Sequence, residues 1–153
     1  LQRTIAMLAD LGVDGAVVGF ARDGRLDLEA IRAVLAAAPH LPVTLHRAFD
    51  SVADPLRAID EALTFPQIDR ILTSGGDGDW PARCRRFKEY TARAGSRITF
   101  LPGGGLDDQA LVALAASKCV GEAHVGKAAR EPQVATATVS KSRVHLLKTI
   151  ASL

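Results

Sequence analysis

Short apolar runs recur along this chain at a nearly constant interval. The runs rich in β-forming residues cover positions 15–20, 42–45, 70–72, 98–101 and 122–125. Their starts are 27, 28, 28 and 24 residues apart. This interval accommodates a strand, a helix and two short loops, whereas the strands of a hairpin follow one another after a short turn. The spacing therefore predicts a repeating unit of one β-strand and one α-helix.

The segments between these runs change to the apolar spacing of helices, and capping residues mark their starts. Asp27, Asp54 and Asp107 each precede such a segment and are N-cap candidates. Two further helices are expected at the ends of the chain, one ended by Gly12 and one beginning at about Thr136. Because short strands that are apolar on both faces alternate with helices, we expect a parallel sheet covered by helices.

Two architectures contain such a sheet. A doubly wound sheet would place a Gly-x-Gly-x-x-Gly loop after its first strand, but residues 19–24 read Gly-Phe-Ala-Arg-Asp-Gly. A TIM-type barrel carries polar and glycine-rich segments at the C-terminal ends of successive strands, which is the pattern found here. A complete barrel needs eight units and about 250 residues. We therefore predict an α/β fold: one domain over residues 1–153, an incomplete TIM-type barrel of about five parallel strands with flanking helices, lacking the first three units.

The residues with chemical potential gather where the predicted strands end. The candidates are His46, Arg47, Asp50, Thr73, Ser74, Gly75, Gly76, Gly103, Gly104, Gly105 and His124. Hydroxyl groups and exposed backbone N–H groups are suited to an anion such as phosphate, although the same glycines also suit a tight turn.

The charged candidates each have two interpretations. His46 is either an acid/base or ligand-binding imidazole or a core histidine hydrogen-bonded to a neighbouring strand. Arg47 is either an anion clamp or the partner of Asp50 in an ion pair. Because neighbouring residues of a strand face opposite ways, His46 and Arg47 can share a direction only where the strand has ended. His124 either faces His46 across the cavity or is structural.

Composition excludes several classes of function. A net charge of +2, spread evenly, does not indicate nucleic-acid binding. No apolar run is long enough for a membrane span, and the first ten residues do not resemble a signal peptide, so a cytoplasmic location is expected. Cys84 and Cys119 lie 35 residues apart without metal-site spacing. We expect both to be packing residues and expect no metal site.

Several motifs occur together in one order. They are residues 43–50 (Val-Thr-Leu-His-Arg-Ala-Phe-Asp), 70–76, 102–105 and 122–124, preceded by 12–20 and 23–27. In this order and spacing the chain resembles the CutC family of copper homeostasis proteins. The resemblance implies a TIM-type barrel of which the five runs are strands four to eight. It also implies a cytosolic role in copper binding, trafficking or tolerance, and copper(I) as the ligand.

The chain also departs from the family. The cysteines proposed as the family's copper(I) ligands belong to the first three strands, which precede anything present here, so this chain is expected to be a fragment without them. After His124 the family has small hydroxyl residues, whereas this chain has Val125, Gly126 and Lys127.

Three hypotheses follow for the function. The first is a copper homeostasis protein of this family. The second is a barrel enzyme acting on a small anionic or phosphorylated substrate, with His46 as acid/base and Arg47 as anion clamp. The third is a partial barrel without activity of its own. Whether the chain is an enzyme is left open.

An incomplete barrel also has consequences for assembly. Segments 15–20 and 122–125 would be open edges of the sheet, and inward residues such as Leu45, Ile71 and Phe100 would lack cover. We therefore expect self-association.

Overall fold

A four-stranded parallel sheet forms the centre of the molecule. The computed structural model describes residues 1–152. The strand order is β1-β4-β5-β6, formed by Ala16–Val18, Val43–Leu45, Ile68–Thr73 and Thr99–Pro102. All three pairings are parallel, and one row of the register joins Val18, Leu45, Ile71 and Phe100. The predicted parallel sheet is confirmed.

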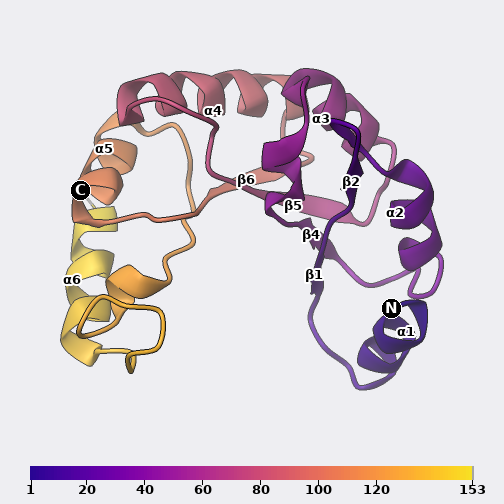
Figure 1. Ribbon diagram of the computed structural model, residues 1–153, viewed down its shortest axis with the longest axis horizontal. Helices are drawn as coiled ribbons and strands as arrows, with labels where there is room; N and C mark the ends of the chain where they lie inside the picture. Colours follow the sequence, from indigo (N-terminus) through magenta and orange to yellow (C-terminus); the bar gives the residue numbers. More distant parts are fainter. Residues whose placement is uncertain (153) are drawn as a thin grey trace.

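Helices connect the strands and lie on one side of them. The six α-helices are α1 (Gln2–Asp10), α2 (Leu28–Leu35), α3 (Pro55–Leu63), α4 (Trp80–Ala94), α5 (Asp108–Ser117) and α6 (Lys141–Ala151). They follow the outer side of an arc that has the strands on its inner side (Figure 1). The predicted N-caps are confirmed, because the carboxylates of Asp27, Asp54 and Asp107 each accept a backbone N–H from the first turn.

Short elements complete the architecture. A hairpin of β2 (Ala21–Arg22) and β3 (Arg25–Leu26) precedes α2, and two 3₁₀ helices, η1 (Arg47–Ser51) and η2 (Lys127–Ala129), follow β4 and the predicted fifth strand. No helix within residues 1–152 has both the length and the apolar character needed to cross a membrane.

The two faces of the sheet differ in polarity. Leu45, Ile71 and Phe100 are between 0% and 2% exposed and pack in the core. The adjacent register row joins Val17, 63% exposed, to Thr44 and Arg70 on the inner side of the arc. The expectation that Leu45, Ile71 and Phe100 would lack cover is therefore wrong. These side chains face the helices, and the uncovered face carries partly polar residues instead.

The C-terminal unit differs from the prediction. Residues 122–125 form no strand, and their one backbone bond to the sheet runs from the His124 N–H to the Pro102 carbonyl at 2.8 Å. The last helix begins at Lys141 rather than near Thr136, with Ser140 as its N-cap. The described sheet thus has four parallel strands rather than five.

Candidate functional site

The chain turns sharply where β4 ends. The strand stops at Leu45, and residues 47–51 continue as η1, with the His46 side chain as its cap. Phe49 is 2% exposed and meets the ring of Tyr90 edge-on at a centroid distance of 5.9 Å. This buried aromatic contact fixes η1 on the core. It thereby positions the two charged residues of η1, Arg47 and Asp50.

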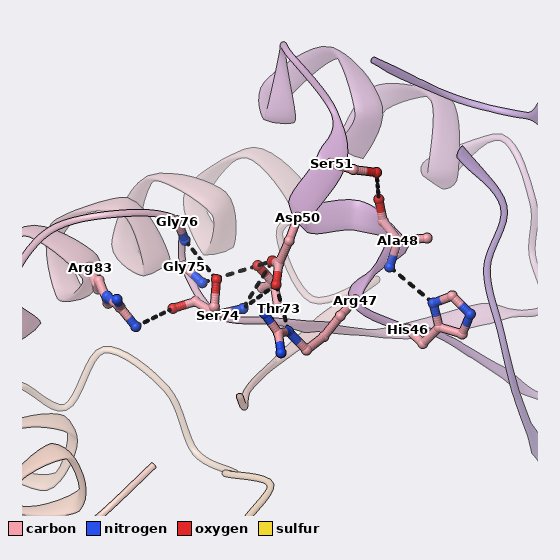
Figure 2. Close-up of polar contacts among 10 residues, drawn as sticks. All are labelled: His46, Arg47, Ala48, Asp50, Ser51, Thr73, Ser74, Gly75, Gly76 and Arg83. Carbon is pink, nitrogen blue, oxygen red and sulfur yellow. Dashed lines mark hydrogen bonds and ion pairs between the residues drawn. The ribbon is translucent and has the colours of Figure 1, made fainter. Parts of the chain in front are cut away.

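The Asp50 carboxylate connects β4 and β5. It accepts the Thr73 hydroxyl at 2.5 Å, the Ser74 backbone N–H at 3.0 Å and Arg47 Nε at 2.7 Å. Figure 2 shows these bonds converging on the carboxylate. The ion pair that the sequence offered as one interpretation of Arg47 is present. Because Asp50 holds one side of the guanidinium, the remaining N–H groups have a fixed direction.

The loop that follows β5 uses its own backbone donors. Ser74 N–H donates to Asp50, Gly75 N–H to the Thr73 hydroxyl at 3.1 Å, and Gly76 N–H to the Ser74 hydroxyl at 3.2 Å. Both glycines have a φ of 77°. The loop therefore cradles the carboxylate of Asp50, and an external anion would have to compete with that carboxylate for the Ser74 N–H.

Two arginines of α4 hold the carbonyl side of the same loop. Arg83 donates to the Gly78 carbonyl at 3.0 Å, and Arg86 donates to the carbonyls of Gly75 and Asp77. Helix α4 thus fixes the loop's shape from outside the sheet.

The glycine loop after β6 is arranged differently. Gly103 N–H donates to the Thr73 carbonyl at 2.9 Å, which joins the two loops side by side. A Cβ placed on Gly104 would lie 2.8 Å from Arg47 Cζ, and the φ of Gly104 is 92°. Only glycine allows the guanidinium to lie this close to the backbone here.

Arg47 and the loop at Gly104 line one pocket together with two other basic side chains. A cavity of about 380 Å³ is lined by Arg47, Gly104, Gly105, His124 and Lys127, with Leu72, Leu106 and Gly126. The backbone bond of His124 to Pro102 holds the histidine at this edge of the sheet. Lys127 is not among the site residues predicted from the sequence. Its position three residues after His124, in the segment that departs from the family's small hydroxyl residues, was the available signal.

His46 lies outside this pocket. Its Nδ1 accepts the Ala48 N–H at 2.9 Å, and a Cβ on Gly19 would lie 2.8 Å from that nitrogen. In Figure 2 the imidazole points away from Arg47 and Asp50. Its Nε2 is the nitrogen that remains for other chemistry. The structure therefore joins Arg47, the second glycine loop and His124 in one pocket and leaves His46 beside it.

The two cysteines are close together despite their separation in sequence. Cys84 is 6% and Cys119 5% exposed, and both are free thiols. Burial raises the pKa of the Cys119 thiol, the Ser117 hydroxyl lowers it, and direct interaction with the Cys84 thiol raises it further. Within residues 1–152 no group of three or more His, Cys, Asp or Glu side chains is arranged to hold a metal ion.

The comparisons with known proteins agree on one family. A family model described as the CutC family matches residues 1–129. A family protein CutC of Xanthomonas campestris pv. campestris (strain 8004) is 36% identical over 136 residues, which are 88% of this chain and 55% of the relative. The human copper homeostasis protein cutC homolog is 41% identical over 101 residues, 65% of this chain and 37% of the relative.

A solved structure has the same fold. The crystal structure of CutC from Streptococcus agalactiae matches with a TM-score of 0.70 and 26% identity, covering 80% of this chain and 60% of that one. This chain therefore has the fold of part of a TIM-type barrel. It spans about half the length of the curated bacterial relative it matches.

Proposed function

The chain belongs to the CutC family, and from this premise we propose that it takes part in copper homeostasis. The support is its similarity to copper homeostasis proteins, among them the human and mouse copper homeostasis protein cutC homologs, each 41% identical over 101 residues. The proposal places the protein in the cytoplasm, where thiols such as Cys84 and Cys119 stay reduced.

We further propose that the pocket beside β6 binds a small anion. The observation that carries this proposal is the Arg47 guanidinium lying on the backbone of Gly104, with His124 and Lys127 lining the same cavity. Asp50 neutralises one side of Arg47 at 2.7 Å but leaves Lys127 as a second cation. Guanidinium groups recognise phosphate and carboxylate through paired N–H donors, and an ammonium group adds a point charge.

Catalysis in this pocket is the second candidate function. In that case Arg47 would clamp an anionic substrate and His124, rather than His46, would be within the cavity to move a proton. The catalytic roles of His46, Arg47 and Asp50 stay predictions.

Titration with inorganic phosphate tests the anion pocket. We expect saturable amide shifts at Gly104, Gly105 and Lys127 in NMR spectra. Arg47→Ala should weaken the binding at least about tenfold, because a hydrogen bond to a charged group contributes about 1.5–3 kcal/mol. Arg57→Ala is the matched control, since Arg57 is an exposed arginine of α3 paired with Glu61. Phosphate shifts confined to the loop at residues 73–76, or their absence, would contradict the proposal.

Growth of cells tests the copper role. A bacterial strain lacking its own CutC protein should tolerate copper better when it expresses this chain than when it carries the empty vector. Expression of the chain without any effect on copper tolerance would count against a role in copper homeostasis.

A further inference from the structure

Another pocket lies between the last two helices and the irregular edge of the sheet. It has a volume of about 210 Å³ and is lined by Leu111 of α5, by Ala123, Val125 and Ala129, and by Val144, Leu147, Lys148 and Ala151 of α6. Figure 1 shows the chain after α5 running along the inner side of α6 before it reaches η2. The pocket shares no lining residue with the anion pocket, so it is a separate site.

The lining of this pocket is apolar except for one cation. Leu111 and Leu147 are buried, at 4% and 5% exposed, and Val144 is half-buried. Lys148 is the charged residue of the lining and is exposed. Among residues 1–152 its ammonium group joins no ion pair. A lysine so placed lays its methylene stem along the apolar surface and keeps its charge at the rim.

The edge segment separates this pocket from the anion pocket. Ala123 and Val125 line the apolar pocket, whereas His124 and Lys127 line the anion pocket. Residues 123–125 thus alternate between two sides, as the residues of a strand do. Because the side chains of Ala123 and Ala129 are short, the chain itself does not fill the space between the edge and α6.

We propose that this pocket binds a small aliphatic carboxylate. The alkyl chain lies against Leu111, Val125 and Leu147, and the carboxylate meets the ammonium group of Lys148 at the rim. The lysine opposes an aliphatic amine, which carries the same charge. A phosphate group fits the anion pocket better, since that pocket offers Arg47 and Lys127 together. The proposal rests neither on the copper role nor on the anion pocket.

The two parts of such a ligand contribute differently. Each methylene that leaves water for an apolar surface raises the affinity about fourfold. An ion pair at an exposed rim raises it about two- to fivefold. The alkyl chain therefore supplies most of the affinity, and Lys148 selects the charge of the head group.

NMR titration of the full chain with butanoate, hexanoate and octanoate tests the pocket. We expect saturable shifts at the amides of Ala123, Val125 and Leu147. The affinity should rise about fourfold per methylene until the pocket is filled. Hexylamine, with the same chain and a positive charge, should bind more weakly than hexanoate. An excess of inorganic phosphate should not displace hexanoate.

Two variants separate the alkyl chain from the charge. Ala123→Phe should fill the pocket and abolish hexanoate binding, and an unchanged amide spectrum of β5 would show that this variant is folded. Lys148→Met keeps the stem and removes the charge, so it should weaken hexanoate two- to fivefold and leave hexanol unchanged. Lys141→Met is the matched control, because Lys141 is an exposed lysine of α6 outside the pocket.

Several results would overturn the proposal. They are the absence of saturable shifts, shifts confined to Gly104 and Gly105, an affinity that does not depend on chain length, and a folded Ala123→Phe variant that still binds hexanoate. A Lys148→Met variant that still prefers hexanoate to hexylamine would also overturn it. The phosphate titration and the copper tolerance test use other ligands, so the failure of this pocket leaves both of those proposals standing.

Discussion

The two edges of the sheet have the same kind of position but different structures. Strand β1 and residues 122–125 each have a single neighbour in the sheet, β4 and β6 respectively. Strand β1 is regular over three residues and pairs in register with β4. Residues 122–125 make one backbone bond to β6 and form no strand.

The side chains explain the difference. Strand β1 contains two adjacent valines, and Val18 is 6% exposed in the core. The other edge reads Glu-Ala-His-Val, and its first three residues are exposed. Of these two edges, the one with a buried β-branched side chain forms a strand, and the one with mostly exposed residues does not. The irregular edge is also the one that delivers His124 and Lys127 to the anion pocket.

The largest effect should come from the centre of the sheet, compared with its edge. Ile71 of β5 is 0% exposed, so Ile71→Ala should destabilise the chain by about 2–5 kcal/mol through lost burial and an unfilled cavity. Val17→Ala, at the 63% exposed position of β1, should cost less than about 1 kcal/mol. Urea unfolding followed by circular dichroism measures both. Equal losses would contradict the assignment of the two faces.

The next largest effect is expected at the end of β6, where the regular sheet borders its irregular edge. A Cβ on Gly103 would lie 2.5 Å from Leu72 Cδ1, so Gly103→Ala should cost about 1–3 kcal/mol by overpacking. Gly121→Ala should be nearly neutral, because no atom beyond its chain neighbours lies within 4 Å of the added carbon. The double variant with Leu72→Ala should lose less than the two single losses combined. Additive losses in denaturant unfolding would show that the two residues do not compete for space.

The repeating unit could be predicted from sequence because local signals set it. The interval between apolar runs, and carboxylates such as Asp27 and Asp54 at helix starts, act within a few residues of one another. The direction of Leu45 and Ile71 could not be predicted. Successive residues of a strand alternate between the two faces of the sheet. Which face the helices cover depends on packing, and a strand that is apolar on both faces does not indicate it.

The site was predictable in part for the same reason. Residues at strand ends meet wherever the sheet is parallel, which brought Arg47 to the Gly104 loop. The capture of the Ser74 N–H by Asp50, and the meeting of Cys84 with Cys119, depend on tertiary contacts between units. Nothing in the spacing of these residues along the chain indicates them.

Self-association should depend on the regular edge. Strand β1 leaves one side of its backbone without a neighbouring strand in the described sheet, and Val17 is exposed beside it. We expect sedimentation velocity to show a concentration-dependent dimer that Val17→Lys shifts towards monomer. Val112→Lys is the control, since Val112 is a 46% exposed valine of α5 outside the sheet. A parent chain that stays monomeric at every concentration would contradict the prediction.

The smallest effect should appear at the C-terminal unit as the pH falls. Helix α6 is tied to α5 by Arg143, which pairs with Asp108 and donates to the Ala128 carbonyl at 3.0 Å. The hydrogen bond from Arg143 lowers the pKa of Asp108 from its ordinary value of 3.8. A carboxylate whose pKa is lower in the folded state stabilises the fold above its unfolded pKa, and this contribution is lost as the pH falls towards the folded value. The effect is small because the Asp108 side chain is 41% exposed.

Amide exchange should therefore show α6 losing protection below about pH 4 while β5 keeps it. Asp108→Asn should lower the protection of α6 at neutral pH and remove its pH dependence. If α6 in the parent chain keeps its protection down to pH values where β5 also opens, the ion pair is not what holds this helix against α5.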